Sequence, residues 1–195
     1  MDLIFATNNR HKIIEISSLL DPGTKLAGLA DVNINEDIPE EGETLQENAL
    51  FKARFVHLRT GLNVFADDTG LEVEALGGAP GVHSARFAGE DKDSSANIDK
   101  LLLMLEGVKN RNARFRTVIA LIYEESEYLF EGTVNGKIIF ERKGDEGFGY
   151  DPVFLADGHS LTFAEMPLSE KNMISHRARA FAALLRFLSE RAETK

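Results

Sequence analysis

The spacing of hydrophobic residues predicts a strand and a helix at the start of the chain. Residues 3–6, Leu-Ile-Phe-Ala, form an apolar run of the length of a short buried strand. Ile13, Ile16 and Leu20 then recur at helical spacing, which indicates one buried face of a helix.

A second helix is expected to run from a capping box to a glycine. Thr44 and Glu47 have the spacing at which side chains and backbone cap a helix start. Gly61 can end the helix, because glycine readily adopts the left-handed conformation found there. The predicted buried stripe consists of Leu45, Ala49, Ala53 and Val56.

An apolar run from Val64 leads directly into two adjacent carboxylates, Asp67 and Asp68. We expect this buried strand to end at the acids, in a turn made with Thr69 and Gly70. Paired carboxylates there can hold a divalent cation or activate a water molecule. Taken alone, these four residues are more typical of an ordinary turn.

The rest of the chain predicts a helix, a strand-rich stretch and a last helix. Ser94 or Ser95 can cap the first of these helices, and Ser175 can cap the last. Residues 115–123, 128–132 and 134–140 predict an antiparallel meander. The helix faces expected to be buried contain Ile98, Leu101, Leu102 and Leu105, and Phe181, Leu184, Leu185 and Leu188. Together the elements predict an α/β fold with a mixed sheet flanked by helices.

Composition narrows the class of protein. At 195 residues the chain can form one domain, or one domain of two lobes around a cleft. It contains no cysteine, which excludes zinc–thiolate sites and a cysteine nucleophile. Its formal net charge of −10 argues against a general nucleic-acid binder. No apolar run approaches the ~20 residues of a membrane span and no signal-peptide pattern is present, so a cytoplasmic protein is expected.

Two loops have features of nucleotide sites. Residues 7–12 combine the side-chain donors of Thr7-Asn8-Asn9 with Lys12 at a predicted helix start, where anions are favoured. The glycine pattern of a Walker A loop is absent, so a plain helix cap is the better interpretation of this stretch alone. Residues 147–152, Gly-Phe-Gly-Tyr-Asp-Pro, offer two aromatic rings and a carboxylate to a nucleobase, but suit a turn equally well.

Charge is concentrated in two further places. Lys171, His176 and Arg177 gather at the start of the predicted last helix. Helix starts normally favour acids, so these cations predict a nearby anion such as a phosphate or purine ligand. Residues 36–43 form an acidic loop, from which one carboxylate can join Asp68 on Mg²⁺ while the others are expected to be solvated.

Together these stretches resemble the inosine triphosphate pyrophosphatase family, the noncanonical purine NTP pyrophosphatases. Each match alone is weak, but they occur in the family's order from the first strand to the last helix. They are Thr7-Asn8-Asn9 with Lys12, Pro39-Glu40, Glu47-Asn48-Ala49, residues 66–71, residues 77–81 with Ser84-Ala85-Arg86, residues 147–152, and Ser175-His176-Arg177.

The resemblance implies an activity, a fold and an assembly. Family members use Mg²⁺ to hydrolyse dITP, ITP and XTP to the monophosphate and pyrophosphate, which cleanses the nucleotide pool. The implied fold is an elongated α/β structure, with a long mixed β-sheet flanked by helices and two lobes around a central active-site cleft. We expect residues 1–195 to form a single such domain and the protein to be a homodimer or a higher homo-oligomer. A nucleotide is the expected partner, without nucleic acid or membrane.

The resemblance also assigns roles to residues. Asp68 is the implied catalytic carboxylate, which holds Mg²⁺ or accepts the proton of the attacking water, and Glu40 is the implied second metal ligand. Thr69 is expected to contact the substrate. The triphosphate is assigned to Thr7, Asn8, Asn9, Arg10, His11 and Lys12, the base to Phe148, Gly149, Tyr150 and Asp151, and the rest of the pocket to Lys171, His176 and Arg177.

Three points qualify these assignments. Many family members have Thr-Gly-Asn where this chain has Thr7-Asn8-Asn9, and Asn tolerates left-handed backbone better than most residues. Glu40 and Glu41 are adjacent, so a one-residue gap would exchange their roles. We also hypothesise that His176 and Arg177 donate to the 6-keto oxygen of ITP, because a buried donor left unpaired by adenine costs ~1–3 kcal/mol.

Other functions compete for the same residues. Asp68-Thr69-Gly70 is also the Asp-Thr-Gly of aspartic proteases, in which two carboxylates share one proton. One copy would require a homodimer, and the cations near the last helix would have no role. A non-catalytic nucleotide sensor is a second alternative, which the intact Asp68 and Glu40 disfavour. A Maf-type pyrophosphatase shares the broad fold but lacks the Ser-His-Arg segment.

Overall fold

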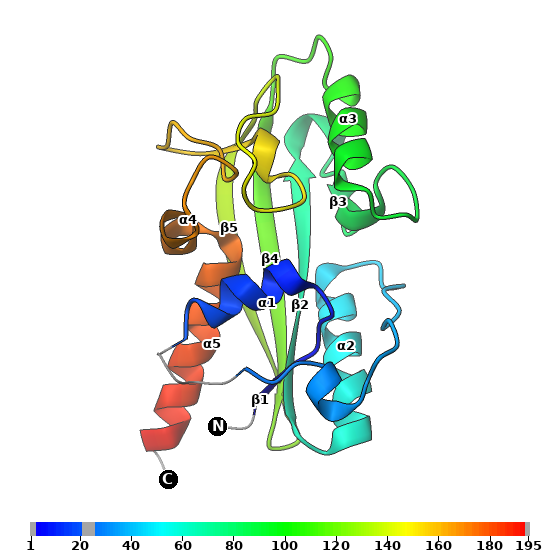
Figure 1. Cartoon of the computed structure of the whole chain (residues 1–195), viewed down its shortest axis with the longest axis vertical. Coiled ribbons are helices and arrows are strands. Elements are labelled where there is room, and N and C mark those ends of the chain that lie inside the picture. Colours follow the sequence, from blue (N-terminus) through cyan, green and yellow to red (C-terminus); the bar gives the residue numbers. More distant parts are fainter. Residues whose placement is uncertain (1–2, 21–25, 194–195) are drawn as a thin grey trace. The chain divides into compact units, whose positions relative to one another are not determined.

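The computed structural model describes residues 3–20 and 26–193, which form a mixed six-stranded sheet and five α-helices (Figure 1). The helices are α1 (Arg10–Ser17), α2 (Leu45–Thr60), α3 (Ser94–Met104), α4 (Leu168–Ile174) and α5 (His176–Glu193). The strands are β1 (Leu3–Phe5), β2 (Asn63–Val73), β3 (Pro80–Gly81), β4 (Asn112–Tyr123), β5 (Ser126–Ile138) and β6 (Phe154–Ala156). The predicted α/β class is confirmed.

The sheet is mixed because its strands pair in both directions. Its order is β1-β2-β4-β5-β6, and β3 pairs separately with β2. β1 runs parallel to β2, whereas β6 runs antiparallel to β5 and β3 antiparallel to β2. In the described part of the chain, no helix is long and apolar enough to cross a membrane.

The chain forms two compact units. Unit 1 contains residues 1–68, 117–132 and 177–195, and unit 2 contains residues 69–116 and 133–176. Strands β2, β4 and β5 therefore contribute residues to both. Each unit has its own hydrophobic core, built around stacked or tilted aromatic rings. These rings include Phe5, Phe65 and Phe181 in unit 1, and Phe115, Phe154 and Phe163 in unit 2.

The predicted features of α2 are confirmed. Thr44 Oγ1 accepts from the Glu47 N–H, and the Glu47 carboxylate accepts from the Thr44 N–H, which completes the capping box. Gly61 ends the helix in the left-handed conformation, with φ of 66°. The stripe predicted to be buried, Leu45, Ala49, Ala53 and Val56, is buried.

The cap of α3, the end of α1 and the helix that contains Lys171 were predicted wrongly. α3 is capped by Asp93 rather than by Ser94 or Ser95, because the Asp93 carboxylate accepts from the N–H groups of Ser95 and Ala96. α1 ends at Ser17, so Leu20 lies beyond it. Lys171 belongs to the separate helix α4, because the extended backbone of Ser175 interrupts the helical path before α5.

The prediction that β2 ends in a turn at Asp67-Asp68 is also wrong. The strand continues through both acids and through Thr69-Gly70 to Val73. Gly70 permits the close approach of β3, since a Cβ atom there would lie 2.6 Å from the Gly81 carbonyl oxygen. The acidic pair is therefore held in the middle of a buried strand, where each carboxylate needs compensating partners.

The predicted strands 128–132 and 134–140 are one strand, β5. The meander is thus a long hairpin of β4 and β5 whose turn is Glu124-Glu125, with φ of 49° and 63°. Positive φ at both central residues is the pattern of a type I′ turn, which favours Asn-Gly. Glutamate is disfavoured there because its Cβ crowds the backbone.

Replacing Glu124-Glu125 by Asn-Gly should stabilise unit 1. Relief of left-handed strain should raise the free energy of unfolding by about 1 kcal/mol in urea denaturation. The exposed contact between Glu125 and His57 is lost in this variant, so Glu125→Gln, which keeps the strain, is the matched control. An unchanged or lower unfolding free energy in the Asn-Gly variant would contradict this account of the turn.

Candidate active site

The two adjacent carboxylates of β2 have different partners because side chains alternate along a strand. Asp67 and Asp68 point to opposite faces, and both are buried within unit 1. Asp67 contacts Lys12 of α1 and Arg177 of α5, whereas Asp68 contacts Asn48 and Lys52 of α2. The pair is therefore two separate polar groups rather than one dyad that shares a proton.

The Asp67 carboxylate is fully compensated. Lys12 Nζ lies 2.9 Å from Oδ1 and Arg177 Nε lies 3.1 Å from Oδ2. Burial by itself would raise the pKa of Asp67, but Lys12, Arg177 and Lys52 outweigh burial and hold this pKa well below its usual value. Arg177 also forms an ion pair with Glu15 of α1. Asp67 is thus ionised at neutral pH and links three elements, β2, α1 and α5.

The Asp68 carboxylate is less strongly stabilised in its charged form. Asn48 Nδ2 donates to Oδ2 at 3.1 Å, and Lys52 Nζ lies 3.3 Å from Oδ1. Burial raises the pKa of Asp68, and the neighbouring Glu40 raises it further, against the opposing effect of Lys52. A carboxyl group with a raised pKa is better suited to accept a proton than Asp67.

Glu40 joins Asp68 through a shared lysine. Lys52 Nζ forms ion pairs with Glu40 Oε1 and with Asp68 Oδ1, so the two carboxylates converge on one point. Within unit 1, the linked group contains four carboxylates (Glu15, Glu40, Asp67 and Asp68) and three cations (Lys12, Lys52 and Arg177).

This donor set fits a hard divalent cation. The group carries an excess of one negative charge when all its members are ionised, and its converging ligands are carboxylate oxygens. Among the described residues, no group of three or more His, Cys, Asp or Glu side chains could hold a metal ion. Mg²⁺ usually takes only one or two carboxylates, together with water and substrate phosphates. The pair Asp68 and Glu40 meets that requirement.

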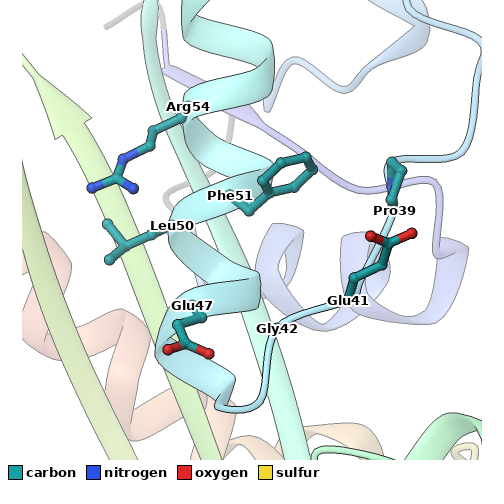
Figure 2. Close-up of a pocket in the computed structure, with 7 residues that line it drawn as sticks. All are labelled: Pro39, Glu41, Gly42, Glu47, Leu50, Phe51 and Arg54. Atoms are coloured by element: carbon teal, nitrogen blue, oxygen red, sulfur yellow. The ribbon is translucent and has the colours of Figure 1, made fainter.

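Glu41 faces a different environment from Glu40. Together with Pro39 and Gly42, it lines a pocket of about 380 Å³ whose other wall is the outer side of α2 (Figure 2). Figure 2 shows Glu41 on the loop opposite Phe51. The geometry therefore places Glu40, not Glu41, beside Asp68 and Lys52.

The loop at residues 7–12 caps α1 and supplies one cation to the acidic strand. Asn9 is the N-cap, and its side chain accepts from the N–H groups of His11 and Lys12. Thr7 Oγ1 accepts from the Asn9 N–H, whereas Asn8, Arg10 and His11 are exposed. Asn8 has no positive φ, so its backbone conformation does not require glycine at this position.

Unit 2 assembles the second group of predicted site residues. Asp151 Oδ2 accepts from Lys171 Nζ at 2.6 Å and from the Phe148 N–H at 2.8 Å. Gly147 is required for this turn, because it has φ of 74° and a Cβ atom there would lie 2.2 Å from Asp151 Oδ2. The Tyr150 hydroxyl donates to the Ser84 carbonyl, and burial raises the pKa of Tyr150. The His176 ring stacks on Phe115, with centroids 4.6 Å apart.

The structure thus divides the predicted cationic group. Lys171 pairs with Asp151 in unit 2, and Arg177 pairs with Asp67 and Glu15 in unit 1. The anions that we expected from a ligand are, for these two cations, carboxylates of the protein. Thr69 follows Asp68 in β2 and is half-buried. The substrate-binding roles of these residues stay predictions.

The sequence assigned no role to Glu15, Asn48 or Lys52, although Asn48 lies in the matching segment Glu47-Asn48-Ala49. Asn48 and Lys52 are one helical turn apart on α2, and both are buried beside the predicted apolar stripe. Polar residues at i and i+4 within the buried half of a helix were the available signal, because such groups need polar partners. Glu15 lies next to the apolar Ile16 and gave no comparable signal.

Comparison with known proteins identifies the relatives of this chain. Residues 3–187 match the Ham1 family. The chain is 57% identical over 187 residues to the dITP/XTP pyrophosphatase of Porphyromonas gingivalis, covering 95% of this chain and 96% of that protein. It is 52% identical over 190 residues to the dITP/XTP pyrophosphatase of Christiangramia forsetii, covering 97% and 100%. The structure of the Staphylococcus aureus Ham1 protein superposes with a TM-score of 0.87 at 38% identity, covering 97% and 98%.

Replacing Asp67 by Asn should destabilise the metal-free protein in a pH-dependent way. Loss of one partner from a buried ion-pair group should lower the free energy of unfolding by about 3 kcal/mol at pH 7. Because the folded pKa of Asp67 is depressed, its contribution is present above the unfolded pKa and is lost as the pH falls through the folded pKa. The deficit of the variant should therefore shrink below about pH 4.

Urea denaturation in EDTA at a series of pH values measures this deficit. Asp99→Asn is the control, because Asp99 forms an exposed pair with Arg142 and should cost less than about 1 kcal/mol. A deficit for Asp67→Asn that matches this control at pH 7 would contradict the assigned role.

Proposed function

Because the chain belongs to the Ham1 family, we propose that it hydrolyses the deaminated purine nucleotides dITP, XTP and ITP to the monophosphate and pyrophosphate. The names of its relatives, dITP/XTP pyrophosphatase, support this activity and its class, hydrolysis of an acid anhydride. The structural observation that carries the proposal is the convergence of Asp68 and Glu40 on Lys52, within a group that has an excess of negative charge.

In this proposal Asp68 is the general base. It accepts a proton from a water molecule whose oxygen attacks the α-phosphorus, while the bridging oxygen to the β-phosphorus leaves with pyrophosphate. Asp68 shares its lysine with Glu40, which supports this role, whereas Asp67 is paired with both Lys12 and Arg177, which supports a fixed charge instead. Lys12 and Lys52 offset the negative charge of the triphosphate. The resemblance assigns the triphosphate to the loop at residues 7–12, which contains Lys12 but not Lys52.

We propose Mg²⁺ as the cofactor, with Asp68 and Glu40 as its protein ligands. When bound, the ion neutralises phosphate charge and polarises the reacting phosphoryl group. The two converging carboxylates support this assignment, since Lys52 already holds a positive charge at the point that they share. The place of Glu41 in the separate pocket on the outer side of α2 supports Glu40 rather than Glu41 in this role.

The purine base is assigned to the residues of unit 2. Phe148 is half-buried and lies with its ring 5.3 Å from Lys171 Nζ, and Asp151 joins both residues through hydrogen bonds. A ring held in this way offers a stacking surface, and Asp151 and Lys171 offer an acceptor and a donor. Gly149, Tyr150, Thr69, His176 and Arg177 complete the residues that we propose for the substrate.

The alternative functions have less support. An aspartic protease needs two carboxylates that share a proton, whereas Asp68 forms an ion pair with Lys52. A nucleotide sensor would bind its ligand without hydrolysing it, so turnover distinguishes it directly. We also propose a homodimer in the cytoplasm. Phe51 and Leu58 are large apolar residues exposed on α2 and are available to a partner subunit.

Replacing Asp68 by Asn should abolish turnover while the fold is kept. Loss of a general base should lower the rate of pyrophosphate release from dITP by about 10²–10⁴-fold. Calorimetric binding of dITP should persist, and circular dichroism should match the parent protein. Asp99→Asn on the exposed face of α3 is the control. Turnover of Asp68→Asn within about fivefold of the parent would remove Asp68 from the chemistry.

Replacing Phe148 by Ala should weaken substrate binding more than it slows the reaction. Base stacking on an aromatic ring contributes ~1–3 kcal/mol, so KM for dITP should rise roughly tenfold or more with kcat changed much less. Met173→Ala, at an exposed position of α4, is the control in unit 2. Equal KM values in the parent and in Phe148→Ala would show that the base is bound elsewhere.

A further inference from the structure

Asn48 links the acidic loop to Asp68 through its two amide ends. It is buried on α2, with 2% of its surface exposed. Asn48 Oδ1 accepts from the Gly42 N–H at 2.8 Å, and Asn48 Nδ2 donates to Asp68 Oδ2 at 3.1 Å. A backbone N–H can only donate, so the amide oxygen must face Gly42 and the NH₂ group must face the carboxylate.

Gly42 fits this arrangement because it has no side chain. A Cβ atom at position 42 would lie 2.8 Å from Asn48 Oδ1 and 2.8 Å from Glu47 Cβ. The loop can therefore approach α2 closely enough for the hydrogen bond only with glycine at this position. Glu40 is two residues earlier, so the bond to Asn48 fixes the register of the loop that carries it.

The same side chain also fixes the orientation of Asp68. Asn48 engages Oδ2 and Lys52 engages Oδ1, so both carboxylate oxygens are held. Lys52 also holds Glu40. The two carboxylates are thus tied together in two ways, by the charge of Lys52 and by the hydrogen bonds of Asn48. A divalent cation that replaces Lys52 between them would remove the first tie and leave the second.

We propose that Asn48 is a positioning residue, which keeps the Glu40 loop and Asp68 close together when a divalent cation takes the place of the Lys52 ammonium between their carboxylates. Its link to catalysis rests on the proposed function, but binding of the cation does not require turnover. Removing a hydrogen bond to a metal-ligating carboxylate typically lowers metal affinity by about 10–100-fold.

The chain offers a matched control for this role. Asn97 is also a buried helical asparagine, with 3% exposed, and also ties a loop to its helix. Its Oδ1 accepts from the Ala88 N–H and its Nδ2 donates to the Ala85 carbonyl, within unit 2. Asn97→Ala therefore reproduces the loss of a loop tether without touching the carboxylates of unit 1.

The test measures Mn²⁺ binding to nucleotide-free protein by calorimetry, together with the Mg²⁺ concentration that gives half-maximal turnover of dITP. Asn48→Ala should weaken Mn²⁺ binding and raise the half-maximal Mg²⁺ concentration by at least tenfold, with kcat largely recovered at saturating Mg²⁺. Asn97→Ala should change neither by more than twofold, although both variants lose unfolding free energy.

Gly42→Ala tests the same link from the loop side and does not remove a buried side chain. It should also weaken Mn²⁺ binding, by at least fivefold, whereas Gly28→Ala, where a Cβ meets nothing closer than 3.9 Å, should not. If the parent binds no Mn²⁺ without nucleotide, or if Asn48→Ala and Gly42→Ala bind it as the parent does, the inference is overturned. Asn48-dependent Mn²⁺ binding without any turnover would instead uphold it and overturn the proposed function.

Discussion

The site depends on the alternation of side chains along one buried strand. Asp67 and Asp68 are neighbours in β2, yet they face opposite sides of it, and a buried carboxylate is tolerated only with a compensating partner. One face is compensated by Lys12 and Arg177, and the other by Lys52 and Asn48. The helices of unit 1 are therefore anchored on the strand through charge as well as through apolar packing.

Because of this alternation, Asp67 can have a structural role while the adjacent Asp68 has a chemical one. Two strong cation contacts keep Asp67 ionised, and this ties α1 and α5 to β2. Asp68 has one lysine, which it shares with Glu40, and its pKa is raised rather than lowered. A carboxylate that is incompletely compensated can accept a proton or a metal ion, and the fully compensated one cannot do so without cost to stability. The division of roles follows from the different partners on the two faces.

Local patterns predicted local features well. The capping box at Thr44, the end of α2 at Gly61 and the buried stripe between them depend on neighbouring residues, and all three are confirmed. The end of β2 was predicted wrongly because acidic residues and glycine favour turns only when nothing else satisfies them. Here Lys12 and Arg177 come from 55 and 110 residues away, respectively, which no local pattern can reveal.

The candidate site was predictable only in part, because local patterns do not reveal partners that come from distant segments. Asp68 and Glu40 follow from motif order, and the structure brings both to Lys52. The choice of Glu40 over Glu41 needed the path of the loop across α2, and the role of Asn48 needed the position of Gly42. The cations Lys171 and Arg177 suggested a ligand by sequence, but their carboxylate partners lie in distant segments that only folding brings near.

The central claim is that this chain converts deaminated purine nucleoside triphosphates to monophosphate and pyrophosphate. Its most direct test is pyrophosphate release from a panel of dITP, XTP and ITP against dATP, dGTP and dCTP, with and without Mg²⁺. The account predicts rapid release from the first three, little from the others, and none without a divalent cation. Equal rates across the panel, or release of orthophosphate instead of pyrophosphate, would contradict it.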